Sequence, residues 1–234
     1  KLLLFFEQAS VLGAEYSVCL RRTDGSPPVV LGKGIAYALS PDGVWVLASL
    51  PSPEAPLLLL PMGPGEAKEI KLPGLSHRGA VFFPDGRSIL VEGYEAGHGA
   101  RLYRVGLDGG LPRAVTAEGI FPIGNARFTI SPDGKWVAAT GPGAGTGRGP
   151  NVWLYPIEGG ERRKLPGVTQ VAVPIRWSAD GAAVLVAEPD RTTKIVTTKI
   201  VRVDVATGQR IVVRELVPAD PLARAGLLIV MTPD

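Results

Sequence analysis

The sequence predicts an all-β protein, a β-propeller of about five four-stranded antiparallel blades. Three observations favour this fold class. A Pro-Asp-Gly turn motif recurs at intervals of roughly 43 to 54 residues, a repeat length typical of propeller blades and solenoids. Short apolar runs flank the copies of this motif. Glycine and proline supply 30 and 22 of the 234 residues, and such a density of helix breakers disfavours long helices.

The repeated turn predicts the first hairpin of each blade. Asp-Gly between two β-forming runs favours a tight turn, because glycine adopts the positive φ that such turns need and aspartate accepts hydrogen bonds from turn amides. A fifth copy, Thr232-Pro233-Asp234, stops before its glycine. The structural turn residues are expected to be Asp42, Gly43, Asp85, Gly86, Asp133, Gly134, Asp180 and Gly181.

Four strands are expected in each repeat, since a helical repeat would instead show a 3.6-residue period. First strands are predicted at Ile35–Leu39, Ala80–Phe82, Ala126–Ile130 and Ile175–Trp177, and second strands at Trp45–Ser49, Ser88–Glu92, Trp136–Thr140 and Ala183–Ala187. Third strands are predicted at Tyr16–Leu20, Leu57–Leu60, Leu102–Leu107, Val152–Ile157 and Ile200–Val205. Fourth strands are predicted at Pro28–Leu31, Glu66–Leu72, Arg113–Thr116, Arg162–Leu165 and Arg210–Leu216.

The two ends of the chain are predicted to complete one blade together. The chain is treated as a single propeller domain, with blades at 33–73, 74–117, 118–167 and 168–217 and a composite blade from 1–32 plus 226–234. Pairing of Leu227–Met231 with Leu2–Phe6 would close the ring and remove exposed sheet edges, which favours a monomer. Alternatively, the chain is a piece of a longer propeller, and its edges stay open or pair with another molecule.

Composition excludes several classes of protein. The longest apolar runs, such as Leu57–Leu60, are far below the ~20 residues of a membrane helix, so no membrane insertion is expected. The net charge is +3 and the basic residues are scattered, whereas a nucleic-acid site would gather them on one face. A lone cysteine, Cys19, forms neither an intrachain disulfide nor a zinc site by itself. No metal and no cofactor is expected.

At the Ser-Pro-Asp-Gly turns and the following Gly-Gly turns, the chain resembles the TolB-like, WD-like family of bacterial β-propeller repeats. The resemblance covers nearly the whole chain, although Phe83 replaces the serine in the second repeat and Ala179 replaces the proline in the fourth. It implies a propeller fold and a periplasmic or otherwise extracytoplasmic location. The segment 203–234 also resembles the propellers of bacterial receptor-type serine/threonine kinases, which implies a sensor role. The chain carries no kinase motif itself.

The candidate binding residues are expected opposite the short, uniform turns, on the face where loops differ in length. His77 and His98 either flank a pocket or are solvated loop residues. Arg127 and Arg176, on first strands, either hold an anionic ligand group or pair with carboxylates between blades. The glycine-rich run 141–150 lacks a phosphate-loop pattern and is expected to be a flexible hairpin loop. The predicted ligand-binding residues are His77, Arg78, His98, Arg127, Arg148 and Arg176.

The sequence gives no sign of catalysis, so no catalytic residue is predicted. The predicted innermost strands contain no Asp or Glu, whereas acid–base work on a sugar bond needs paired carboxylates. Gly74-Leu75-Ser76-His77-Arg78-Gly79 is one residue too long for a nucleophile elbow. The predicted function is therefore non-catalytic binding or scaffolding of a protein, a peptide or a small anionic ligand, as the sensor portion of a larger bacterial protein. The alternative is a gating or accessory domain of a peptidase-type hydrolase.

Overall fold

The computed structural model describes residues 2–8, 16–120, 128–141, 151–169, 171–190, 192 and 197–217. Within these ranges nineteen strands form five sheets, and no residue is helical. Nowhere in these ranges does a helix occur that is long and apolar enough to cross a membrane. The chain divides into two compact units, one of residues 1–118, 124–126 and 232–234, the other of residues 119–123 and 127–231.

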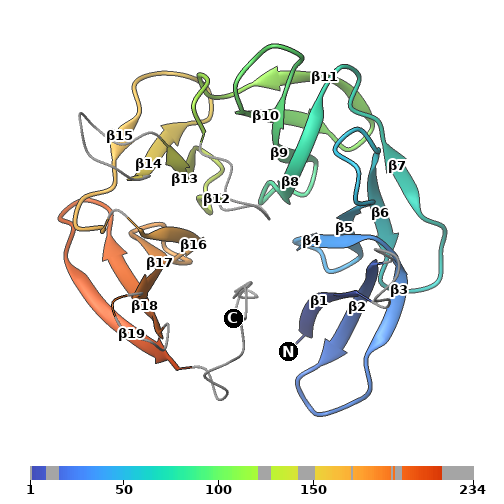
Figure 1. Ribbon diagram of the computed structural model, residues 1–234, viewed down its shortest axis with the longest axis horizontal. Coiled ribbons are helices and arrows are strands. Elements are labelled where there is room, and N and C mark those ends of the chain that lie inside the picture. Colours follow the sequence, from blue (N-terminus) through green and yellow to red (C-terminus); the bar gives the residue numbers. More distant parts are fainter. Residues whose placement is uncertain are drawn as a thin grey trace. The chain divides into compact units, whose positions relative to one another are not determined.

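The first unit holds three of the sheets (blue to green in Figure 1). The first sheet contains β1 (Leu2–Gln8), β2 (Tyr16–Arg22) and β3 (Val29–Lys33). The second contains β4 (Ile35–Leu39), β5 (Trp45–Ser49), β6 (Leu57–Pro61) and β7 (Lys68–Ile70). The third contains β8 (Ser76–Phe82), β9 (Ser88–Tyr94), β10 (Arg101–Gly106) and β11 (Gly109–Ala114).

The second unit holds the other two sheets (yellow and orange in Figure 1). The fourth sheet contains β12 (Phe128–Ile130), β13 (Trp136–Gly141), β14 (Asn151–Pro156) and β15 (Arg163–Lys164). The fifth contains β16 (Val173–Trp177), β17 (Ala183–Asp190), β18 (Thr197–Asp204) and β19 (Arg210–Leu216).

The predicted fold class is confirmed. Each sheet is antiparallel and its strands follow the chain order, so each is a meander of the kind that forms a propeller blade. The partner predicted to complete the first sheet, Leu227–Met231, lies outside the described residues, as does the last turn, Thr232-Pro233-Asp234. Closure of the ring therefore stays a prediction.

Several strand boundaries differ from the predicted ones. β8 begins at Ser76 rather than Ala80, because a bulge at Arg78 lets the polar start of the strand pair with β9. The outer strands β7 and β15 are shorter than predicted. An outer strand pairs on one side only, so its hydrogen-bond ladder ends after fewer residues. A short edge strand also discourages pairing with other chains.

The Ser-Pro-Asp-Gly turn satisfies its own polar groups. In the fourth sheet, Gly134 takes φ 70° and its amide donates to the carbonyl of Ser131 at 2.8 Å. The Ser131 hydroxyl accepts the amide of Trp136 at 2.9 Å, and the Asp133 carboxylate accepts the amide of Lys135 at 3.0 Å. The turns at Asp42 and Asp180 repeat this arrangement. The predicted structural role of these turn residues thus has a direct hydrogen-bonding basis.

In the second repeat, where Phe83 replaces the turn serine, different contacts hold the turn. Phe83 stands in place of the serine and is only 2% exposed, and the Arg104 guanidinium lies 4.4 Å from its ring centre. Arg104 also lies 3.7 Å from the Asp85 carboxylate, which still accepts the amide of Arg87 at 2.9 Å. An apolar contact and a cation–π contact therefore replace the serine hydroxyl.

Ser131→Ala should lower the free energy of unfolding by about 1–2 kcal/mol, because the partly buried amide of Trp136 loses its acceptor. Urea denaturation would measure this loss. Ser52→Ala is the matched control, since Ser52 is exposed in the loop between β5 and β6 and should change stability by less than about 0.5 kcal/mol. Equal losses in the two variants would contradict the role given to the turn serine.

Apolar side chains fill the space between neighbouring sheets within each unit. In the first unit, Leu47 and Leu57 of the second sheet pack with Ile89 and Val91 of the third. In the second unit, Leu154 and Leu165 share a cluster with Val184 and Val201. The Trp177 indole in the fifth sheet also donates to the carbonyl of Thr129 in the fourth at 3.0 Å. Within each unit, neighbouring sheets therefore bury apolar faces against one another, as layered β domains do.

Candidate functional site

Each hairpin of first and second strands has two distinct ends. The Asp-Gly turn lies at one end, here called the turn end. At the other, here called the loop end, the first strand begins and the second strand finishes. In the third sheet, His77 and Arg78 follow Ser76 at the start of β8 and Tyr94 ends β9, so all three lie at the loop end of this sheet. The predicted placement of His77, Arg78 and His98 opposite the turns agrees with this topology.

His77 is a buried strand residue. It is 2% exposed, its amide donates to the carbonyl of Pro53 at 2.8 Å, and its Nε2 donates to the carbonyl of Ala55 at 2.8 Å. The ring meets Tyr37 edge to face at 6.3 Å. Burial lowers the pKa of His77, so the neutral ring with hydrogen on Nε2 fits these contacts. The interpretation of His77 as a solvated loop residue is wrong, because the strand extends through it and the loop between β5 and β6 covers it.

Arg78 is exposed at the loop end, next to a buried carboxyl group. As the extra residue of the β8 bulge, it places its guanidinium 5.4 Å from the centre of the Tyr94 ring. Glu92 of β9 is 3% exposed, and its Oε1 has no hydrogen-bond partner. Burial raises the pKa of Glu92 to about 7, although the positive charge of Arg78 acts to lower it. Glu92 also contributes to the raised pKa of Tyr37, after burial of that phenol.

Glu92 is a residue that sequence reasoning missed. It falls in the predicted second strand Ser88–Glu92, whereas paired catalytic carboxylates are expected on first strands. The signal was present, since a single charged residue sits within the otherwise apolar or small run 89–93 and a charge on a strand buried on both faces is unusual.

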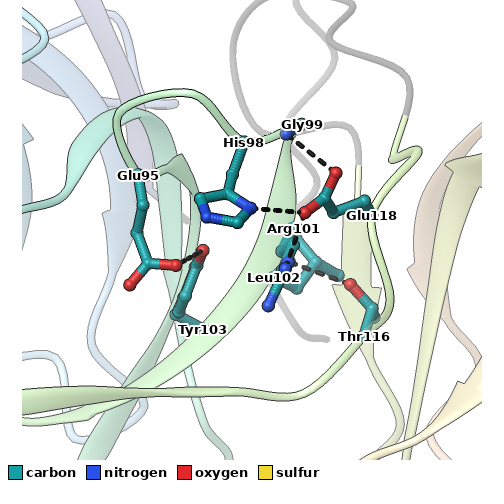
Figure 2. A network of polar contacts seen from close by, with 8 residues as sticks. All are labelled: Glu95, His98, Gly99, Arg101, Leu102, Tyr103, Thr116 and Glu118. Carbon is teal, nitrogen blue, oxygen red and sulfur yellow. Dashed lines mark hydrogen bonds and ion pairs between the residues drawn. The ribbon is translucent and has the colours of Figure 1, made fainter.

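His98 belongs to a network centred on the carboxylate of Glu118 (Figure 2). Nδ1 of His98 and Nη2 of Arg101 lie 2.8 and 2.7 Å from Oε1, and the amide of Gly99 donates to Oε2 at 3.1 Å. The hydrogen bond from Arg101 has the largest part in lowering the pKa of Glu118 to about 2, and the hydrogen bond from His98 has the next largest. The network ties the loop between β9 and β10 to the segment that follows β11.

Glu118 and Arg101 were also absent from the predicted set. The two residues are far apart in the sequence, and no local pattern joins residues 98, 101 and 118. Figure 2 also shows the neighbouring contacts on the same sheet, in which the Tyr103 hydroxyl donates to Glu95 at 3.3 Å and the Leu102 amide donates to Thr116 at 3.0 Å.

The predicted arginines fall in different parts of the chain. Arg78 lies in the first unit, and Arg176 lies in the second, half-buried in β16 opposite Leu185. Arg127 and Arg148 lie outside the described residues. Within the part of the chain that the structure describes, no three His, Cys, Asp or Glu side chains are grouped as a metal site.

Several solved structures have a fold similar to this one. TolB from Acinetobacter baumannii matches over 90% of this chain with a TM-score of 0.70 and 19% identity. The chain has a TolB-like β-propeller fold. It spans 52% of the length of that TolB protein. No protein-family model matches the sequence, and no curated protein matches it.

The same fold also occurs in proteins that are described as enzymes. An oligogalacturonate lyase in complex with manganese matches 92% of this chain with a TM-score of 0.60 and 16% identity, and the chain spans 62% of it. The β-propeller domain of the Trilobed protease from Pyrococcus furiosus matches 91% with a TM-score of 0.57 and 12% identity, and the chain spans 68% of it. At these identities the likeness concerns the fold, which hosts both catalytic and non-catalytic proteins.

Proposed function

We propose that the chain is a non-catalytic binding propeller, which takes a protein, a peptide or a small anionic ligand at the loop ends of its blades. The observation that carries this proposal is the contrast between the two ends of the blades. At the turn end, Ser131 and Asp133 direct their hydrogen bonds to their own turn. At the loop end of the third sheet, Arg78 is exposed beside Tyr94, and a cationic group over an aromatic ring is a common anchor for partners.

The chemistry of the loop end suits binding better than catalysis. Arg78 supplies a planar fork of donors that matches a carboxylate or phosphate group. His77 uses Nε2 on the carbonyl of Ala55 and therefore positions the loop between β5 and β6 beside Arg78. His98 and Arg101 already hold Glu118, which favours a structural role for this pair and leaves Arg78 for ligand contact at the loop end of the third sheet. Arg127, Arg148 and Arg176 remain predicted ligand residues.

Arg78→Glu should weaken binding of peptides selected against the wild-type chain from a displayed random library, and should leave the Tm within a few degrees. Isothermal titration of the selected peptides would measure the loss, expected to be at least about tenfold in Kd, since reversal of one interface charge costs more than about 1.4 kcal/mol.

Arg87→Glu is the matched control for that experiment. Arg87 is also exposed and belongs to the same sheet, but it follows the Asp85-Gly86 turn at the opposite end. Peptides whose affinity drops as much with Arg87→Glu as with Arg78→Glu would contradict a binding site at the loop end.

A gating or accessory domain of a peptidase-type hydrolase is the second candidate. It is favoured by the likeness to the β-propeller domain of the Trilobed protease. The reading frame that surrounds these 234 residues discriminates between the candidates. A Gly-x-Ser-x-Gly hydrolase domain would support gating, whereas a kinase domain would support the sensor role. Neither solved enzyme above is described as a kinase, so attachment to a kinase stays a prediction.

A further inference from the structure

Outer strands of the described sheets differ in how well they are protected against pairing with another chain. β7 has three residues and begins with Lys68 and Glu69, and β15 has only two, Arg163 and Lys164. β11 carries Pro112. Short length, charge and proline are the usual means by which proteins block an open sheet edge.

β19 lacks two of these protections, short length and proline, although Arg210, Arg214 and Glu215 give it charge. It is seven residues long, lies at the edge of the fifth sheet, and contains no proline. Its central run, Ile211, Val212 and Val213, is 53%, 56% and 54% exposed. β3 also exposes two valines, Val29 and Val30, but it has five residues and Gly32 interrupts it. A long apolar edge with free backbone groups is a template for addition of another strand.

The charges of β19 fit a second copy of the same strand. Arg210 pairs with Val203 and Glu215 pairs with Lys199, and since positions 199 and 203 of β18 are four apart, Arg210 and Glu215 lie on one face of the sheet. In an antiparallel pair of two β19 strands centred between Val212 and Val213, each Arg210 stands opposite the Glu215 of the other copy. Opposite charges in directly facing positions stabilise such a pair.

The existing contact of Arg210 is compatible with this register. Its Nη2 lies 2.6 Å from Oε2 of Glu188, a carboxylate only 8% exposed, and a guanidinium has five N–H donors, which leaves others for a second carboxylate. The register of β19 with β18 shifts at Val213, while Arg210–Val212 pair without interruption. The shift accounts for the odd residue that places Arg210 and Glu215 on the same face.

We infer that the chain associates with a second copy of itself through antiparallel pairing of β19, with Val212 and Val213 at the centre. The contact is isologous, so it closes after two copies and gives a dimer. It uses the outer strand of one sheet and is independent of the ligand proposed for the loop end. The monomer that the sequence predicts would then be the dissociated state at low concentration.

Sedimentation velocity over about 5 to 500 µM tests this inference, because an interface of one strand pair is small and its affinity is expected in the micromolar range. Wild type should shift from monomer to dimer as the concentration rises. Val212→Lys should weaken association at least about tenfold by placing two ammonium groups at the centre of the pair. Glu215→Arg should weaken it as well, because it sets like charges opposite each other.

Leu111→Lys is the matched control. Leu111 is 88% exposed on β11, an outer strand that contains Pro112, so this variant should dimerise as wild type does. All substituted side chains are exposed, so circular dichroism should report an unchanged fold. A wild-type chain that stays monomeric throughout the range would overturn the inference, and so would a dimer that Leu111→Lys weakens as much as Val212→Lys. A dimer that persists in Glu215→Arg would overturn the proposed register.

Discussion

Glu92→Gln should gain stability relative to wild type as the pH rises from about 5 to about 8. Burial raises the pKa of Glu92 from 4.5 to about 7, so the folded chain holds a proton that the unfolded chain releases. In wild type, the stability that this group contributes is fully present below pH 4.5 and is lost as the pH rises through 7. A shift of this size corresponds to about 3 kcal/mol in the difference between the two unfolding free energies.

The difference between the variants, rather than the wild-type curve alone, isolates this group. His77 acts in the opposite direction, because burial lowers its pKa below 6.5 and its contribution is lost as the pH falls. Urea denaturation of both proteins at each pH would give the difference. Glu69→Gln, at an exposed position of β7, should show no such trend. A difference between wild type and Glu92→Gln that is independent of pH would rule out protonation of Glu92 in the folded state.

The parts of the fold that the sequence predicts well are those decided by local contacts. Asp133-Gly134 needs a positive φ and amide acceptors within five residues, and the structure supplies both from the same turn. Apolar runs on either side of the turn then fix the strands, since the side-chain period of two is visible over a few residues. The third and fourth strands follow in the same way, with errors of length where an outer strand pairs on one side only.

The candidate site depended on contacts that no local pattern encodes. The sequence leaves open whether His77 flanks a pocket or is a solvated loop residue, and the loop between β5 and β6 supplies the carbonyls that allow it to be buried. Glu118 joins His98 from 20 residues away. Such partners depend on how a later strand folds back on the sheet, and a single sequence shows neither the register nor the bulge that places them.

Gly167→Ala should be among the most destabilising single substitutions in the second unit, with a loss of about 3 kcal/mol or more. Gly167 follows β15 and Gly208 lies in the turn between β18 and β19, so their contact joins neighbouring sheets. Gly167 has φ 71°, and a Cβ there would lie 2.2 Å from the carbonyl oxygen of Gly208. The variant combines the strain of a left-handed residue with a backbone that must move apart.

Gly43→Ala separates the two causes. Gly43 has nearly the same φ of 70°, but a Cβ there would meet no atom within 4 Å, so its loss should be limited to the conformational cost of about 1–2 kcal/mol. Urea denaturation of both variants would give the excess at Gly167, which measures the close approach of the two sheets. Equal losses would mean that the segment 166–167 moves away from the β18–β19 turn without cost, and that the buried cluster around Leu165 and Val203, rather than this backbone contact, holds the sheets together.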